Sequence, residues 1–576
     1  MKRCLPHNGF CLTGEVGKLA DNLTTHWLIG LRETNPAILD MFRERDTKPY
    51  RDLLPWSGEF AGKYLTGAHT IYCLNHNEAL KTYVTGFIDE LLTYVDDDGY
   101  IGCFQKECRL TGAYSQTPSV TGATWDAWTH YHILLGLLLW TDELKRVDWQ
   151  TAIDKIAGLF LRTFYTGERR LVDIGSTEMN LAPLHIFALL YARTGDVRYR
   201  RFCEEILQDL SAPTAGDYIN HSRRGLEYYQ CPKPRWESLH IIQGIAAFGR
   251  ATGDEALEQV AEQIFTSILH TDIHNTGGFS TDEQAVGNPY TNGNIELCCV
   301  IAYNALACDM LYRTGDSRIA DFLELSLYNA ILGSFSPTGR WSTYNTPMEG
   351  SKCANYHTIV FQSRPGSPDL NCCSANAARG VGMLSDWAVL QQDDTLYLNS
   401  YEACEMELDG GLSIRITGRY PLEPLLRIQL SSTGARRSKK LALRIPAWSE
   451  NTSVLLAGQP IVAQAGTYLI LEPVWDGEEI QLQLDFAPHF TEGGGDYTGK
   501  CSVYYGPILY GCDQSCNLEL DFDRLPLLSR AELQHTRPVQ RADGRWIVSL
   551  GNGVTLSDFY RLGVTGSRYT TWLDCR

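Results

Sequence analysis

A short helix-to-helix junction occurs three times near the middle of the chain and constrains the fold more than any other feature. Each copy reads Thr-Gly-Asp after an apolar segment, with its glycine at position 195, 253 or 315, so the copies are 58 and 62 residues apart. The glycine can take the left-handed conformation that ends a helix, and the aspartate can cap the next helix. Spacings of this length hold two helices and their loops, so we expect stacked helical hairpins.

Helical periodicity extends from about residue 15 to residue 390. Apolar residues recur at three- and four-residue steps in segments such as 78–92 and 256–264, which is typical of helices with one buried face. An open solenoid and a closed α/α toroid are both compatible with such repeats. We expect a toroid, because solenoid repeats are usually shorter and more regular.

The sequence pattern changes after residue 390 to strict alternation of apolar and polar residues, for example in segments 395–401, 412–417, 440–445 and 480–485. Alternation with a period of two predicts strands with one buried face. We therefore predict a multidomain α plus β chain. It has a helical domain over 1–390, whose N-terminal segment can pack with the β modules. A β-sandwich over 391–490 and a β-rich module over 491–576 follow.

Charge and composition exclude several classes of protein. The 576 residues carry 50 Lys and Arg against 68 Asp and Glu, a net charge of −18, and such a field repels the phosphates of nucleic acids. No window approaches eighteen uncharged apolar residues, so we expect no membrane-spanning helix. The basic start at Met1 is not followed by an apolar segment of a secretory signal. We therefore expect a cytoplasmic protein whose eighteen cysteines are mainly reduced.

Two pairs of adjacent cysteines are the strongest chemical signal. Cys298-Cys299 follows Glu296 at the start of one helical run, and Cys372-Cys373 precedes another. Adjacent side chains diverge within a helix, but at a turn leading into one they can approach a single ion, and the helix N-terminus lowers their pKa. Glu296, Cys298, Cys372 and Cys373 would form a tetrahedral site suited to Zn²⁺. The alternative, that these are small buried hydrophobic side chains, fits most of the eighteen cysteines.

Loop carboxylates and aromatic side chains supply further candidates. Asp282-Glu283 lies in a loop upstream of Glu296, where it is either an acid/base pair or a solvated turn. Trp128 is one of several aromatic residues near predicted helix ends, and flat aromatic faces with polar edges suit sugar rings.

The residues quoted so far resemble glycoside hydrolase family 127, the β-L-arabinofuranosidase-like enzymes. That family combines a Glu-x-Cys segment with a Cys-Cys pair some seventy to eighty residues later, and here Cys372 follows Cys298 by 74 positions. The segments Asn345-Thr346-Pro347, Leu443-Arg444-Ile445 and Tyr505-Gly506-Pro507 fit the same family. The resemblance covers most of the chain.

The resemblance implies an (α/α)₆ barrel followed by β-sandwich modules, with zinc held by Glu296, Cys298, Cys372 and Cys373. It also implies that Cys372 is the nucleophile. The acid/base glutamate corresponds to Glu283, with Asp282 as the alternative. The resemblance implies that His130, His240 and Asn180 bind the substrate. Trp128 is a further candidate for substrate binding because of its aromatic ring.

These implications define the expected function. It is a retaining exo-glycosidase that releases β-L-arabinofuranose or a related sugar from oligosaccharides or glycoconjugates. The chain departs from the family where Ser374-Ala375 replaces the usual Pro-Pro after the cysteine pair, which leaves the sugar less defined than the metal and the reaction type. Two alternatives stay open: a toroidal glycan hydrolase or lyase with a carboxylate pair and structural zinc, and a non-catalytic carbohydrate-binding protein. The oligomeric state is open too, and a homodimer is compatible with the sequence.

Overall fold

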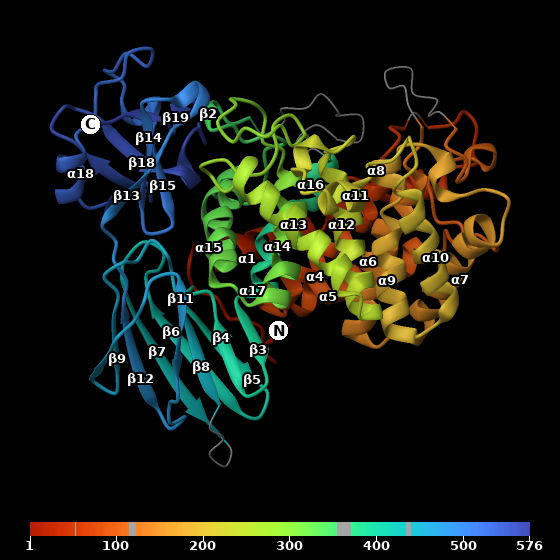
Figure 1. Cartoon of the computed structure of the whole chain (residues 1–576), viewed down its shortest axis with the longest axis horizontal. Helices are drawn as coiled ribbons and strands as arrows, with labels where there is room; N and C mark the ends of the chain where they lie inside the picture. The colour runs from red at the N-terminus through yellow and green to blue at the C-terminus, as the bar shows by residue number, and fades with distance from the viewer. Residues whose placement is uncertain (52, 114–122, 354–369, 434–438) are drawn as a thin grey trace.

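The computed structural model describes residues 1–51, 53–113, 123–353, 370–433 and 439–576. Figure 1 shows three parts: a helical toroid, a β-sandwich at one side of it, and a C-terminal β module above the sandwich. The helices continue to α17 (Leu384–Trp387), and the first strand of the sandwich after them begins at Val389. The predicted order of a helical toroid and then β modules is confirmed.

Six helices form a closed inner ring in which each packs against the next and the last packs against the first. In ring order they are α4 (Glu59–Asn75), α6 (Asp126–Leu144), α9 (Pro183–Thr194), α12 (Leu239–Thr252), α14 (Leu297–Thr314) and α16 (Cys372–Gly382). Neighbours on all sides bury these helices, and in α4 every residue from Glu59 to Leu74 is buried. The ring is therefore closed, as the sequence predicted, and is not an open solenoid.

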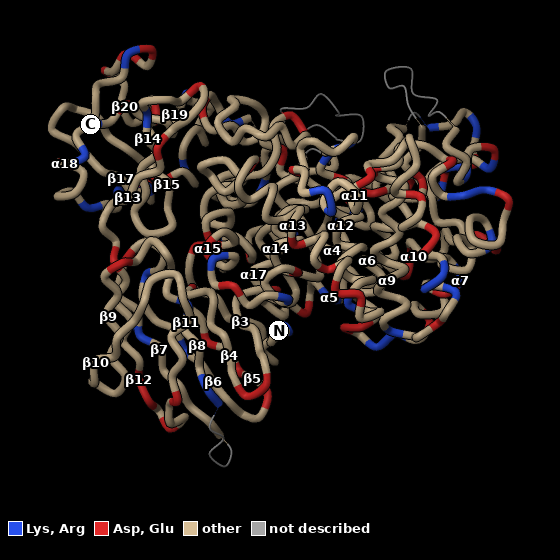
Figure 2. Tube along the Cα trace, in the orientation of Figure 1, with Lys and Arg blue, Asp and Glu red and all other residues tan. Residues whose placement is uncertain are grey.

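A second layer of helices surrounds the ring, each packed against one or two inner helices. These outer helices are α1 (Glu15–Leu23), α5 (Glu78–Leu92), α7 (Val147–Phe160), α10 (Val197–Asp209), α13 (Glu255–Thr271) and α15 (Ser317–Ser326). Their apolar residues lie on one face, which packs inward, while the other face meets solvent. Figure 2 shows acidic and basic residues interspersed on these outer helices.

The Thr-Gly-Asp junctions connect inner to outer helices, as predicted. Gly195, Gly253 and Gly315 have positive φ angles of 68°, 73° and 66° and end α9, α12 and α14. The aspartate after each glycine then accepts a hydrogen bond from a backbone N–H in the first turn of the next helix. Each junction therefore reverses the chain with both helix ends satisfied.

The sandwich contains a five-stranded and a six-stranded sheet. The first has the order β1 (Lys2–Arg3), β3 (Val389–Gln392), β4 (Thr395–Leu398), β8 (Lys440–Ile445) and β11 (Thr467–Leu471). The second has the order β10 (Gln459–Ile461), β9 (Ser453–Leu456), β12 (Glu478–Gln483), β7 (Leu425–Ser432), β6 (Leu412–Gly418) and β5 (Cys404–Leu408). Because β1 pairs with β3, the N-terminal segment joins the sandwich.

A third sheet forms the C-terminal module. Its main path is β13 (Pro488–Glu492), β14 (Lys500–Tyr505), β15 (Ile508–Asp513), β18 (Thr555–Asp558), β17 (Trp546–Ser549) and β16 (Val539–Gln540). A disulfide joins Cys501 to Cys575, and the other sixteen cysteines are free. The expectation of reduced thiols therefore has one exception, at a point where two chain segments lie side by side with Cα atoms 6.1 Å apart.

Arg444 of β8 connects the sandwich to the toroid through ion pairs with α15. Its fully buried guanidinium forms ion pairs with Asp321 and Glu324 of α15, and its Nε donates to the carbonyl of Asn399 at 2.7 Å. Trp448, four residues further on, donates its indole N–H to Glu324 at 3.4 Å. A buried arginine held by two carboxylates fixes the angle between the two parts. None of the described helices is long and apolar enough to cross a bilayer.

The buried Glu402, between the toroid and the sandwich, predicts a pH-dependent stability. Burial raises its pKa to about 8, although the hydroxyl of Tyr328 donates to it at 2.9 Å. The folded state therefore keeps a proton that the unfolded chain releases near pH 4.5. Stability should fall as pH rises from about 4.5 to 8, by up to about 1.4 kcal/mol per pH unit. Glu402→Gln should remove this slope, as measured by denaturant unfolding between pH 5 and 8; equal slopes in both proteins would contradict the prediction.

Candidate metal-thiolate site

Two inner helices begin at the same place, and their first residues form the site. Glu296 is the N-cap residue of α14, and Cys298 is the second residue of that helix. Cys372 and Cys373 are the first two residues of α16, which packs against α14. The N-cap Asn371 accepts a hydrogen bond from the backbone N–H of Ser374 at 2.9 Å, which fixes where α16 begins.

The carboxylate of Glu296 and the three sulfurs converge. One ligand atom from each of Glu296, Cys298, Cys372 and Cys373 lies within 4.8 Å of all the others, and all four residues are buried. Glu296 Oε1 lies 3.3 Å from Cys373 Sγ and 3.8 Å from Cys372 Sγ. Glu296 and Cys373 thus lie in contact although 77 positions separate them, and the four residues converge as we expected from the sequence.

These donors suit a metal ion. Three thiolates and one carboxylate are the ligand types of tetrahedral Zn²⁺ sites, and the four atoms lie close enough to surround one ion. The second oxygen of Glu296 accepts from the thiol of Cys299 at 3.5 Å, which leaves Oε1 directed at the cluster. Hydrogen bonds to the non-ligating atom of a ligand side chain are typical of metal sites.

Cys298 lies beside two side-chain N–H donors. Lys63 Nζ and Asn376 Nδ2 lie 3.7 and 3.6 Å from its sulfur. Burial raises the pKa of the Cys298 thiol, but hydrogen bonds from Cys372 and Cys373 and the charge of Lys63 outweigh burial and lower it to about 6. The hydrogen bond to Cys298 raises the pKa of Cys372 to about 12. The charge of Lys63 therefore favours the thiolate form of Cys298.

Tyr344 connects the cysteines to the loop carboxylate. Its hydroxyl lies 3.3 Å from Cys372 Sγ and 3.4 Å from Glu283 Oε1. Glu283 is half-buried and forms an ion pair with Arg235, which also pairs with the fully buried Glu237 at 2.8 Å. Burial raises the pKa of Glu237 to about 8, although the charge of Arg235 opposes this. Two carboxylates thus share one guanidinium at the edge of the cluster.

Asp282 and Glu283 are placed differently. Both have positive φ angles, 49° and 69°, so the loop turns sharply there and sends the two side chains in different directions. The exposed Asp282 accepts a hydrogen bond from the backbone N–H of Asn294 at 3.2 Å. Through Tyr344, Glu283 is the one linked to Cys372.

The side chains of Trp128 and His240 lie in an aromatic group next to Lys63. Their rings are 5.0 Å apart, and Lys63 Nζ is 5.9 Å from the Trp128 ring. The indole N–H of Trp128 donates to Glu59, and His240 Nδ1 lies 2.8 Å from the hydroxyl of Tyr131. Both residues therefore lie in the polar, aromatic interior of the ring close to the cysteines.

His130 and Asn180 are engaged with the backbone. His130 Nε2 accepts from the N–H of Ile101 at 3.1 Å, and Nδ1 lies 2.8 Å from the carbonyl of Asp126. Asn180 donates to the carbonyls of Thr124 and Gly175 at 3.1 and 2.9 Å. The structure does not connect either side chain to the cluster within the residues it describes.

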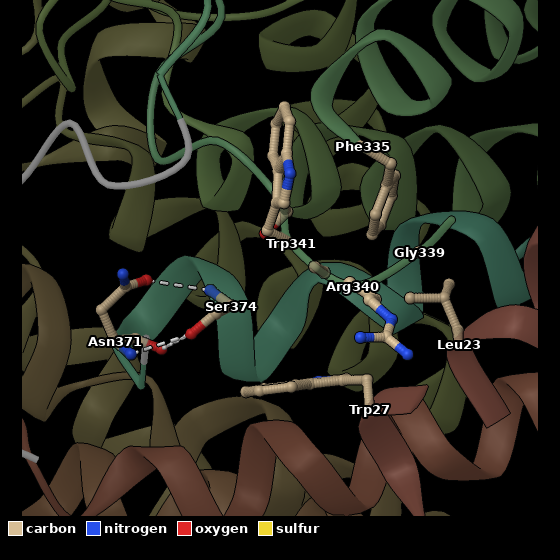
Figure 3. Close-up of a pocket in the computed structure, with 10 residues that line it drawn as sticks. Leu23, Trp27, Phe335, Gly339, Arg340, Trp341, Asn371 and Ser374 are labelled. Atoms are coloured by element: carbon tan, nitrogen blue, oxygen red, sulfur yellow. Dashed lines mark hydrogen bonds between the residues drawn. The ribbon is translucent and has the colours of Figure 1, made fainter. Parts of the chain in front are cut away.

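Figure 3 shows a small aromatic pocket on another face of α16. Trp27, Phe335 and Trp341 line it together with Asn371 and Ser374. The pocket is narrow and mainly apolar, and its lining includes none of the four cluster residues. Cys372 and Cys373 lie on a different side of the same helix turn, because successive residues are about 100° apart.

Sequence reasoning missed Lys63, Glu59, Tyr344, Arg235 and Asn376. Only Asn376 is close in sequence to a predicted ligand, four residues after Cys372, which places it on the same helix face. The other four reach the cluster through long-range packing and belong to no local pattern.

The ring of helix pairs and its centre define an α/α-toroid protein with a buried cluster of one glutamate and three cysteines that could hold a metal ion. The β-L-arabinofuranosidase GH127 catalytic domain matches residues 30–386, and the GH127 middle domain matches residues 395–486. The chain belongs to glycoside hydrolase family 127.

Individual relatives agree with this assignment. The chain is 24% identical over 388 residues to a non-reducing end β-L-arabinofuranosidase of Bifidobacterium longum subsp. longum, an alignment that covers 60% of this chain and 58% of that relative. A GH127 β-L-arabinofuranosidase from Geobacillus stearothermophilus T6 has a similar fold, with a TM-score of 0.77, 18% identity and coverage of 98% and 99% of the two chains. A further GH127 β-arabinofuranosidase superposes with a TM-score of 0.78, 17% identity and coverage of 100% and 98%.

The four-residue cluster predicts how metal binding responds to substitution. Cys298→Ser or Cys373→Ser should weaken Zn²⁺ binding by about tenfold or more, because each removes one of four ligands. Cys299→Ser should bind zinc as the wild type does, because serine can still donate to Glu296. Competition with a chelator, followed by elemental analysis, measures the affinity. Equal affinities of the three variants would contradict the assignment of the ligands.

Proposed function

We propose that this chain is a retaining exo-glycosidase in which Cys372 is the nucleophile and Glu283 the acid/base. The observation that supports this most directly is the Tyr344 hydroxyl, which lies within 3.4 Å of both the Cys372 sulfur and a Glu283 oxygen. A nucleophile and an acid/base group on opposite sides of one small gap suit attack at an anomeric carbon. The cysteine here takes the place of the usual carboxylate nucleophile.

Glu296, Cys298, Cys372 and Cys373 would hold the zinc ion. When bound, the ion supplies a positive charge that favours the ionised form of its thiol ligands. The Cys372 sulfur then attacks the anomeric carbon, and the bond from that carbon to the glycosidic oxygen breaks. Glu283 gives its proton to the departing oxygen, so the first product leaves as an alcohol.

The second half of the reaction regenerates the residues. The Glu283 carboxylate takes a proton from water, whose oxygen attacks the same carbon while the carbon–sulfur bond breaks. The thiolate of Cys372 is restored, and two successive inversions give retention of configuration. Arg235 and Tyr344 hold the Glu283 side chain in reach of the substrate during both halves.

The proposed substrate is an oligosaccharide or glycoconjugate that ends in β-L-arabinofuranose. The name of the Bifidobacterium relative supports this sugar and attack at the non-reducing end. The buried rings of Trp128, Trp236 and His240 provide flat faces beside the cluster, which suits one small sugar ring. We propose these residues as the floor of the sugar site, and we retain His130 and Asn180 as further candidates for substrate binding, although their side chains bond to the backbone here.

A second candidate keeps the toroid and makes the carboxylates the catalytic pair. It is favoured by the sharing of Arg235 between Glu237 and Glu283, and in it zinc would only stabilise the fold. The two mechanisms differ in their sensitivity to thiol alkylation, because a carboxylate pair has no need of a free sulfur.

Replacement of the nucleophile tests the first candidate. Cys372→Ser should lower kcat at least about 1,000-fold on aryl β-L-arabinofuranosides, because the serine hydroxyl is a much weaker nucleophile than a thiolate. Cys299→Ser is the matched control and should keep most of the activity. Turnover can be followed by release of the aryl group, and proton NMR of the first product gives the stereochemistry. Full activity of Cys372→Ser would refute the mechanism.

The acid/base assignment makes a separate prediction. Glu283→Gln should lower kcat by about 10²–10⁴-fold on substrates with a poor leaving group, and less in the first turnover of a nitrophenyl glycoside, which needs no proton. Asp282→Asn should stay near wild-type activity, because Asp282 is exposed and bonded to the backbone. Pre-steady-state kinetics of the three proteins separates the two steps. A larger loss in Asp282→Asn would transfer the role to that residue.

A further inference from the structure

The ammonium group of Lys63 is enclosed beside the sulfur cluster. Nζ lies 2.9 Å from a Glu59 oxygen and 3.7 Å from Cys298 Sγ, and the side chain is 1% exposed. The rings of Trp128 and Trp236 lie 5.9 and 5.1 Å from Nζ. Burying an ammonium group is costly unless charged or polarisable partners surround it. The carboxylate of Glu59, the sulfur of Cys298 and the two aromatic faces are such partners, so they hold Nζ in one position.

The three cluster sulfurs have different neighbours. Cys298 faces two N–H donors, Lys63 Nζ and Asn376 Nδ2. Cys372 meets the Tyr344 hydroxyl, and Cys373 meets the Glu296 carboxylate. Among the described residues, side-chain nitrogen donors thus contact the sulfur of Cys298 but not that of Cys372, which lies beside Tyr344, or of Cys373.

We propose that Lys63, assisted by Asn376, is a positioning residue that makes Cys298 the unreactive sulfur of the cluster and so leaves attack to Cys372. This inference rests on the proposed function, because it explains the choice among three sulfurs that the mechanism requires. An N–H donor stabilises the lone pairs of a thiolate and makes that sulfur a poorer nucleophile. The lysine also offsets part of the four negative charges that three thiolates and a carboxylate bring to one divalent ion.

A merely structural role for Lys63 would predict something else. If the lysine only neutralised Glu59, replacing both residues by neutral ones would leave the sulfurs unchanged. The double variant Glu59→Gln, Lys63→Met therefore separates the two roles, and it avoids leaving a buried carboxylate without its partner. Asn376→Leu removes the other donor without altering any charge, so it tests the same proposal in a protein with an intact ion pair.

The experiment measures which sulfur reacts. The zinc-loaded proteins are treated with iodoacetamide under native conditions, and peptide mass spectrometry gives the ratio of labelling at Cys298 to labelling at Cys372. We expect labelling mainly at Cys372 in the wild type, a ratio raised about tenfold or more in the double variant, and a smaller rise in Asn376→Leu. Lys352→Met, which removes a buried lysine bonded to the Phe559 carbonyl, is the matched control and should leave the ratio unchanged.

A spectroscopic measurement gives a second readout. In the Co²⁺-substituted proteins, loss of the N–H donor should move the sulfur-to-metal charge-transfer band of the double variant to lower energy. An unchanged labelling ratio and an unchanged band in a folded double variant, or in Asn376→Leu if the double variant does not fold, would overturn the proposal. Labelling of the wild type mainly at Cys298 would instead count against the proposed nucleophile, so the two failures are distinguishable.

Discussion

Closure of the helical ring is the constraint on which the site depends. The first inner helix, α4, and the last, α16, are separated by most of the toroid in sequence, yet they pack side by side. Glycines allow the close approach: a Cβ at Gly382 of α16 would lie 2.3 Å from the Thr70 side chain of α4, and one at Gly67 of α4 would lie 3.2 Å from the backbone N of Arg379 in α16. Because the ring closes in this register, Lys63 of α4 reaches the sulfur of Cys298.

The charge balance of the cluster follows from that arrangement. Glu296 and three cysteines at two helix N-termini concentrate negative charge in a place from which water is excluded, and such charge needs a bound cation and nearby positive groups. Lys63 supplies one positive charge from inside the ring, and Arg235 supplies another from the loop side through Glu283. The interior side contacts the sulfurs, whereas the loop side holds Glu283, the proposed acid/base residue.

The sequence allowed prediction of those features that local patterns encode. Glycine at a helix end followed by a capping aspartate needs only neighbouring residues, and these junctions gave the helical hairpins. The four cluster residues were recognisable because a Glu-x-Cys segment followed by a Cys-Cys pair resembles the family pattern; spacing alone left buried cysteines as an alternative. Lys63 could not be found in this way, since 235 positions separate it from Cys298 and a lone lysine in an apolar helix matches no motif. His130 illustrates the converse: the family resemblance implied a substrate contact, but whether its ring nitrogens face substrate or backbone depends on packing that the sequence pattern does not carry.

The C-terminal module contacts the chain segment that follows Tyr344. The strand β2 (Glu349–Gly350) leaves the toroid and pairs with β19 (Tyr569–Thr570) of the third sheet. The side chains of Tyr569 and Thr571 donate to the carbonyls of Pro347 and Met348 at 2.5 and 2.9 Å.

At its other end, this segment is held by a bridge between Asn345 and Glu296. Tyr344 therefore stands next to a length of chain fixed both to a cluster residue and to the C-terminal sheet. Its hydroxyl meets Cys372 and Glu283 because both anchors restrict the backbone that carries it. The C-terminal module thus contributes to the geometry of the site by holding the segment next to Tyr344, whose hydroxyl contacts both the sulfur and the carboxylate.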